Sequence, residues 1–272
     1  MNNTLKKIYD NYKIFHPDGT LLSYCSKKKA NWYIKKQLGI LKGKDVHLTF
    51  EPNGYGDPEE ILAGRENKCV ISGETEELTK HHVIPYMFRK HFPLEYKDKN
   101  SCDIVLLTRQ RHNEYEEKAT ELKIKLITDF VDPFLVEQND MWSICKKRYN
   151  TITNNYDNLP HDKQVFIKMS YEGLLDKYNF DPDTFEYDNP KYTITSPYLD
   201  LIYNEVIANV GIINLIALWK LHFLKVAKPQ YLPDWWKWDN YKVIKRGKKE
   251  KENGLSKIKK TKKLEKLINK YI

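Results

Sequence analysis

One segment in the first half of this chain constrains its fold most, because its sequence predicts the order of four local structures. Residues 78–84 read as a strand that ends at Pro85, and residues 104–107 form a compact apolar run typical of a second strand. The polar residues 85–101 between them predict a loop with one helical turn. Residues 111–126 are rich in Glu, Lys, Ala and Leu, which favour helix. The segment is therefore predicted to fold as two strands followed by a helix, a ββα order.

Histidines lie on the first predicted strand and at the start of the predicted helix. His81 and His82 are adjacent on the first strand, so their side chains point to opposite faces. This placement favours divided roles, with one imidazole facing a water molecule and the other facing a metal. On the helix, His112 and Glu116 are four residues apart and share one face, so they can hold one ion together. A base and a divalent cation are the main parts that phosphodiester hydrolysis needs.

Three runs in this segment carry a resemblance to a known family. They are Leu78-Thr79-Lys80-His81-His82-Val83-Ile84-Pro85, Asp103-Ile104-Val105-Leu106-Leu107 and then His112. Together they are similar to the HNH, or ββα-metal, endonuclease pattern. The resemblance implies that His82 is the general base and that His81 and His112 are metal ligands. The helix spacing adds Glu116 as a further ligand, and Mg²⁺ or Mn²⁺ is the expected ion. Asp103 stands where the middle Asn of that pattern usually lies, and it would orient the base or fix the loop.

The cysteines depart from that pattern. Many of its members add two Cys-x-x-Cys motifs that bind structural zinc. The matching positions here are Cys69, Ser72, Thr108 and Arg111. One thiol of four cannot hold zinc, so no structural zinc is expected and the core is predicted to be held by packing alone. The four cysteines of the chain have no Cys-x-x-Cys spacing, which is typical of reduced thiols in an intracellular protein.

A second resemblance extends over most of the chain. It is carried by Phe50-Glu51-Pro52, Arg89-Lys90-His91-Phe92-Pro93, Asn100-Ser101 and Lys228-Pro229-Gln230-Tyr231-Leu232-Pro233. From about Ile8 to Trp238, the chain resembles the C-terminal half of the exonuclease 3′–5′ domain-containing protein 2 family. The exonuclease activity of that family belongs to an N-terminal domain with spaced acidic residues, which this sequence does not show. The resemblance therefore implies a role in nucleic-acid processing without that exonuclease function.

The expected fold class is α+β, with four parts along the chain. They are a small α+β module at 1–58, the HNH-like ββα core without zinc knuckles at 59–126, a mostly helical region at 127–240 and a basic tail at 241–272 with only a weak amphipathic pattern. The module is predicted to hold strands at 12–15, 21–24 and 45–50, a helix at 26–37 with Ala30, Trp32 and Tyr33 facing inward, and a linker at 52–58. The helical region is predicted to hold helices at 133–150, 162–177, 197–209 and 211–226.

Positive charge is concentrated in the tail. The chain has 46 Lys/Arg and 37 Asp/Glu, of which 13 and 3 lie from Tyr241 onward, so the tail carries +10 and the rest −1. A basic tail is an electrostatic handle for DNA or RNA, or equally a solvated solubility tail. Six basic residues flank the predicted site and would hold phosphates, or else belong to a polar loop in a Lys-rich protein. They are Arg89, Lys90, Lys97, Lys99, Arg109 and Arg111.

The apolar pattern predicts no membrane contact. The longest uncharged run, Val206–Trp219, has 14 residues, too few to span a bilayer. Residues 1–7 are polar and lack the apolar core of a signal peptide, so an intracellular location is expected, in the cytoplasm, the nucleus or a virion. The abundance of Lys, Asn, Ile and Tyr is typical of an AT-rich genome, such as that of a large DNA virus.

Three functions remain open at this point. The first is a metal-dependent HNH-like endonuclease that cuts DNA or RNA. The second is a catalytically inactive nucleic-acid or ribonucleoprotein binding module on a degenerate HNH core, suggested by the missing zinc ligands and by Asp103. The third is a virion-associated structural protein, suggested by composition alone. The sequence predicts no oligomeric state.

Overall fold

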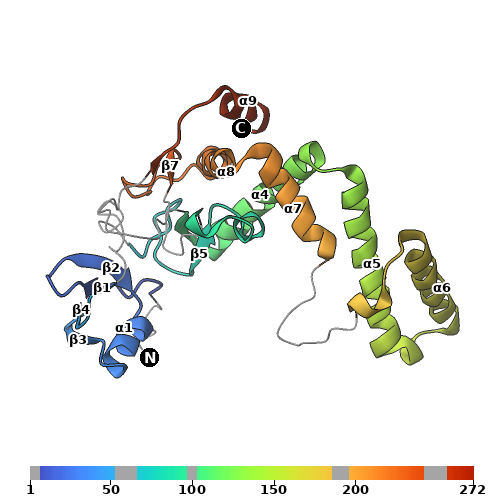
Figure 1. The fold of residues 1–272 in the computed structure, drawn as a ribbon, viewed down its shortest axis with the longest axis horizontal. Helices are drawn as coiled ribbons and strands as arrows, with labels where there is room; N and C mark the ends of the chain where they lie inside the picture. The colour runs from blue at the N-terminus through green and yellow to red at the C-terminus, as the bar shows by residue number, and fades with distance from the viewer. Residues whose placement is uncertain (1–6, 53–65, 97–102, 186–195, 242–255) are drawn as a thin grey trace. The chain divides into compact units, whose positions relative to one another are not determined.

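The computed structural model describes residues 7–52, 66–96, 103–185, 196–241 and 256–272 (Figure 1). The chain divides into two compact units, of which the first joins Met1–Leu122 to Ile212–Ile272 and the second is Lys123–Gly211. Helices and small sheets are both present, so the expected α+β class is confirmed. The first unit contains the N-terminal module, the ββα segment, the last long helix and the tail.

The N-terminal module is a four-stranded sheet with one helix. Its elements are β1 (Tyr12–Phe15), β2 (Leu21–Cys25), α1 (Lys27–Lys35), β3 (Gly39–Lys42) and β4 (Asp45–Leu48). The strand order is β2-β1-β4-β3, with β1 and β4 parallel and both outer pairs antiparallel. Gly19, with φ +90°, allows the tight turn between β1 and β2. The Ser26 hydroxyl accepts the Lys29 backbone N–H at 3.3 Å and caps α1.

The module differs from its sequence prediction in two respects. Strand β3 was not predicted, because three of its four residues are exposed and give no alternation. The inward orientation predicted for Trp32 is wrong, since its side chain is 49% exposed. The inward orientation of Ala30 and Tyr33 is confirmed, because Ala30 lies in the core and Tyr33 packs beside it together with Ile34. The predicted linker lies outside the described residues from position 53 onward.

The ββα segment has the predicted order. Strand β5 (Leu78–His82) pairs antiparallel with β6 (Ile104–Thr108), and α4 (Arg109–Phe130) begins directly after β6. Short α3 (Tyr86–Arg89) and η1 (Leu94–Tyr96) occupy part of the connecting loop, where one helical turn was predicted. Helix α4 is longer than predicted at both ends.

The C-terminal part of the first unit completes its core. Helix α8 (Ile212–Ala227) is largely buried, and its Trp219 ring packs 5.8 Å from that of Phe88. Strands β7 (Asn240–Tyr241) and β8 (Ser256–Lys257) pair, and α9 (Lys262–Tyr271) packs on α8 (Figure 1). The buried Lys220 ammonium donates to the Asn240 carbonyl at 2.5 Å, which fixes the segment that leads to β7.

The second unit is helical. Its elements are α5 (Pro133–Asn155), η2 (Tyr156–Asn158), α6 (His161–Tyr178), η3 (Pro182–Phe185) and α7 (Pro197–Val210). Asp132 and Ser196 cap α5 and α7, each followed by a proline at the first helical position. Asn179, with φ 51°, ends α6 in the left-handed conformation. Trp142, Cys145 and two phenylalanines form the core between these elements.

No single described helix is both long and apolar enough to cross a bilayer. Helices α7 and α8 reach that length only as a pair broken at Gly211.

Candidate metal centre

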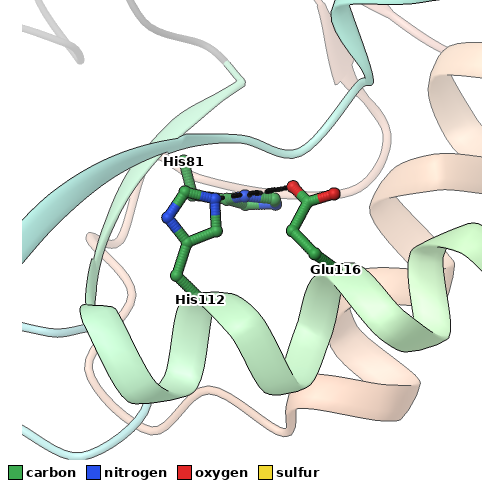
Figure 2. Close-up of side chains that lie close together, drawn as sticks. All are labelled: His81, His112 and Glu116. Atoms are coloured by element: carbon green, nitrogen blue, oxygen red, sulfur yellow. Dashed lines mark ion pairs between the residues drawn. The ribbon is translucent and has the colours of Figure 1, made fainter. Parts of the chain in front are cut away.

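Pairing of β5 with β6 determines which way each histidine of the adjacent pair faces. His81 is 2% exposed and points into the core, whereas the side chain of His82 is 37% exposed. Successive side chains of a strand alternate between its faces, so the two imidazoles have different surroundings. Helix α4, which starts right after β6, carries His112 and Glu116 one turn apart on the side that faces His81 (Figure 2).

The structure brings His81, His112 and Glu116 together. Figure 2 shows the three side chains converging between β5 and α4, and one ligand atom from each lies within 4.8 Å of the others. Nδ1 of His81 is 3.2 Å from Oε1 of Glu116, and Nε2 of His112 is 3.5 Å from the same oxygen. Donors about 2.1 Å from one ion lie roughly 3 to 3.5 Å apart. Both nitrogen–carboxylate distances in the cluster, 3.2 and 3.5 Å, fall in this range.

The tautomer of His112 follows from its other neighbours. The Thr79 hydroxyl donates to the Leu107 carbonyl at 3.1 Å and lies 2.9 Å from Nδ1 of His112. With its own proton used, the hydroxyl accepts the Nδ1–H of His112. The lone pair of the ring is therefore on Nε2, which faces Glu116. A metal-binding histidine is commonly held in this way by a hydrogen bond to its second nitrogen.

His81 provides a test of whether a cation fits the cluster. Both of its ring nitrogens are buried, and neither has a hydrogen bond of acceptable geometry within the described part of the chain. Buried polar atoms are nearly always paired, because an unpaired one loses its hydration without compensation. A cation held by His81 would satisfy one of these nitrogens. The residues present therefore fit a metal.

The protonation states of the cluster also suit a metal. Burial, together with the neighbouring His81, lowers the pKa of His112 below 6.5. The two histidines lower the pKa of Glu116, with His81 contributing the larger share. At neutral pH His112 is therefore a neutral imidazole and Glu116 an ionised carboxylate. These are the forms that bind divalent cations.

His82 is not part of the cluster and has a partner of its own. Its Nδ1 lies 3.3 Å from Oδ2 of the buried Asp103. The same carboxylate oxygen is 3.4 Å from Nε of Arg89, which donates to the Ile84 carbonyl at 3.0 Å. With Nδ1–H directed at Asp103, the lone pair of His82 lies on Nε2. Asp103 is thus placed to fix the orientation and tautomer of His82.

Three aromatic residues around His81 were missed by the sequence analysis. The ring centroid of Tyr115 lies 5.0 Å from that of His81, and Phe223 stacks at 6.1 Å. The Tyr115 hydroxyl is 3.1 Å from Nδ1 of the buried His222. Both His222 and Phe223 come from α8, more than a hundred residues after β5. The sequence offered one signal for these contacts, namely the position of His222 within the otherwise mostly apolar helix α8.

The predicted phosphate-binding residues have different environments. Arg89 faces inward, to Asp103. Arg111 pairs with Glu114 at 2.8 Å on the surface of α4. Arg109 is exposed and Lys90 is partly exposed. Lys97 and Lys99 lie outside the described residues, so the six side chains remain predictions as a phosphate-binding group.

The positions of the absent zinc ligands form tight turns. The Ser72 N–H donates to Sγ of the buried Cys69 at 3.5 Å, and the Arg111 N–H donates to the Thr108 hydroxyl at 3.3 Å. Burial alone would raise the pKa of Cys69, but hydrogen bonds from Ser72 and the backbone of Thr108 lower it overall. The Cys69 sulfur is thus held by N–H donors. Cys25, Cys69 and Cys145 form no disulfide within the part of the chain that the structure describes.

Comparison with known proteins adds relatives that extend over most of the chain. The exonuclease 3′–5′ domain-containing protein 2 of Mus musculus is 30% identical over 258 residues, 86% of this chain and 38% of its own length. The Homo sapiens protein of the same name is 29% identical over 253 residues, 86% of this chain and 40% of its own. The Arabidopsis thaliana protein RRP6-like 3 is 34% identical over 137 residues, 48% of this chain and 15% of its own.

These similarities agree with the second resemblance drawn from the sequence. The chain spans about two fifths of the length of the two exonuclease-named relatives. No family model matches the chain, and no solved structure matches it.

Proposed function

We propose that this protein is a metal-dependent endonuclease of the HNH type, which hydrolyses phosphodiester bonds in DNA or RNA. One observation carries the proposal: His81, His112 and Glu116 present converging ligand atoms. His82, the next residue in the chain after His81, pairs with Asp103. The exonuclease names of the relatives support a nuclease-related function in a coarser sense.

The cluster would hold one divalent cation through two imidazole nitrogens and one carboxylate oxygen. When bound, such a cation supplies polarisation of a phosphate oxygen and offsets the charge that develops on the leaving oxygen. Nitrogen ligands suit Mn²⁺ better than Mg²⁺, which prefers an all-oxygen shell. Of the two ions expected from the sequence, the donor set therefore favours Mn²⁺.

The remaining chemistry is assigned to His82. Its exposed Nε2 accepts a proton from the attacking water, and its Nδ1–H stays on the Asp103 carboxylate. Asp103 stabilises the imidazolium that forms and prevents the ring from turning away. Arg89 holds the carboxylate in turn. In this proposal Asp103 and Arg89 are positioning residues for the base.

The charge distribution supports a nucleic-acid partner for the first unit. Residues 123–211 contain 9 Lys/Arg and 14 Asp/Glu, a net charge of −5. The whole chain carries +9, so the first unit carries +14. A strongly positive unit attracts the phosphate backbone without regard to sequence. The candidate metal centre lies in this unit.

The test is cleavage of supercoiled plasmid DNA and of single-stranded RNA by the purified full chain with added Mn²⁺ or Mg²⁺. His82→Ala is expected to lower the rate by about 100-fold or more, as loss of a general base does. His161→Ala is the matched control, because His161 is an exposed histidine on α6. Full activity of His82→Ala would refute the assignment of the base.

The same experiment separates the competing binding module, which the missing zinc ligands suggest. A chain that binds nucleic acid but cuts neither substrate with either metal would be that module. His112→Ala is then informative, because it is expected to remove Mn²⁺ binding measured by calorimetry as well as cleavage. Cleavage that survives His112→Ala would place the reaction elsewhere in the chain.

A further inference from the structure

Helix α1 exposes a tryptophan among lysines on its outer face. The helix buries Ala30 against the sheet, and Trp32 lies on the opposite side with 49% of its surface exposed. At 100° per residue, Lys28, Lys35 and Lys36 share that side, four residues before Trp32 and three and four after it. All three lysines are exposed. A large ring exposed at this position makes no contribution to the core of the module.

The charge around Trp32 has one sign. Residues 27–44 contain seven lysines and no Asp or Glu. This density is unusual for the body of the chain, whose charges outside the tail nearly cancel. The run covers α1 and the edge strand β3 and ends just before β4. An exposed aromatic ring and several ammonium groups on one helix face are the two features that bind a phosphate backbone with unpaired bases.

We propose that the outer face of α1 binds single-stranded nucleic acid, with Trp32 stacked on a base and Lys28, Lys35 and Lys36 on the phosphates. This inference rests on the proposed function only in taking nucleic acid as the class of partner. It adds a second contact surface, distinct from the metal centre, and it selects strands with unpaired bases. A base inside a duplex is covered on both faces by its neighbours, so Trp32 has nothing to stack on there.

An anionic membrane is the competing partner for a basic helix with a tryptophan. Binding at a lipid surface needs a continuous apolar helix face that enters the acyl boundary. The apolar side of α1 is turned to the sheet, with Ala30 fully buried and Tyr33 and Ile34 packed beside it. The outer face offers Trp32 alone among charged and polar side chains. The geometry therefore favours nucleic acid.

The experiment measures binding of the full chain to a labelled oligothymidine by fluorescence anisotropy, in EDTA and over a range of salt concentrations. Trp32→Ala is expected to weaken binding by about 5- to 100-fold, the size of a lost base–aromatic stack. Trp32→Phe should recover most of the affinity, because a phenyl ring still stacks. The triple Lys28→Gln, Lys35→Gln, Lys36→Gln variant should reduce the slope of log affinity against log salt by about 2.

Matched controls use α6 of the second unit. Phe166→Ala removes another exposed ring, and Lys163→Gln with Lys168→Gln removes charge without a tryptophan beside it. Both are expected to bind as the unchanged protein does. Unchanged affinity of Trp32→Ala would overturn the proposal. So would equal binding to duplex DNA, or a Trp32→Ala defect on phosphatidylserine vesicles with normal oligothymidine binding.

This outcome is separable from that of the proposed catalytic function. Binding in EDTA needs no metal, so a failure to cleave leaves the anisotropy result intact. His82→Ala should bind oligothymidine normally, whereas Trp32→Ala should weaken this binding whether or not the protein cleaves nucleic acid.

Discussion

Replacing His81 with phenylalanine should have opposite effects with and without metal. In the metal-free protein, His81 is 2% exposed, and neither ring nitrogen has a hydrogen bond of acceptable geometry among the described residues, although Nδ1 lies 3.2 Å from Oε1 of Glu116. Its ring packs against Tyr115 and Phe223. A phenyl ring keeps these aromatic contacts and removes the unpaired polar atoms. His81→Phe is therefore expected to stabilise the metal-free fold while it removes the metal site.

The magnitude follows from two opposing terms. An unpaired buried polar atom costs about 1–3 kcal/mol. The phenyl ring is slightly larger than the imidazole, and fitting it into a packed core costs about 1 kcal/mol. The net gain in the free energy of unfolding in EDTA is about 1 kcal/mol, or roughly 2–4 °C in a unit of this size. Mn²⁺ at about 100 times its Kd stabilises a protein that binds it by about 2.7 kcal/mol. The order of stability should therefore reverse when metal is added.

The assay is urea unfolding of both proteins, in EDTA and in excess Mn²⁺. His161→Phe serves as the control at an exposed histidine and should change neither curve. A His81→Phe variant that is clearly less stable in EDTA would show that the His81 nitrogens are satisfied in the folded protein. A variant that still gains stability from Mn²⁺ would show that the ion binds without His81. The first result would refute the reasoning from unpaired nitrogens, and the second would refute the assignment of His81 as a ligand.

Four further predictions rest on other contacts. Tyr115→Phe deprives buried His222 of its phenol and should lower the free energy of unfolding by about 1–3 kcal/mol in urea, whereas Tyr86→Phe on the surface should not. Because the pKa of His112 is lowered below 6.5, calorimetric Mn²⁺ affinity should fall mainly below that pH, where protonation removes the ligand lone pair. Lys220→Met leaves the carbonyls of Lys237 and Asn240 without their ammonium donor and should cost about 1–3 kcal/mol, with faster proteolysis of residues 235–241. Asp132→Ala removes the N-cap of α5 and should cost about 1 kcal/mol, measured by thermal unfolding, while Asp140→Ala within the helix should have little effect.

Local pattern was sufficient for most of the secondary structure. Strong periodicity and turn residues predicted β1, β2, β5, β6 and all four long helices from α5 to α8, with ends within a few residues. Caps add a local signal at α1, α5 and α7, where Ser26, Asp132 and Ser196 hydrogen-bond their own helices over two or three residues. Edge strand β3 was missed for the converse reason. Its exposed side chains carry no alternation, and its place depends on pairing with β4.

The sequence by itself determined the chemistry that the candidate site can offer. The spacing of His112 and Glu116 on one helix face, and the opposite faces of His81 and His82, are consequences of helix and strand periods. Only the tertiary structure decided how these groups are combined. Packing of α4 on β5 brings His81 to His112 and Glu116, pairing of β5 with β6 brings Asp103 to His82, and α8 supplies the aromatic wall. These contacts join residues 21 to 142 positions apart, and no local pattern encodes such separations.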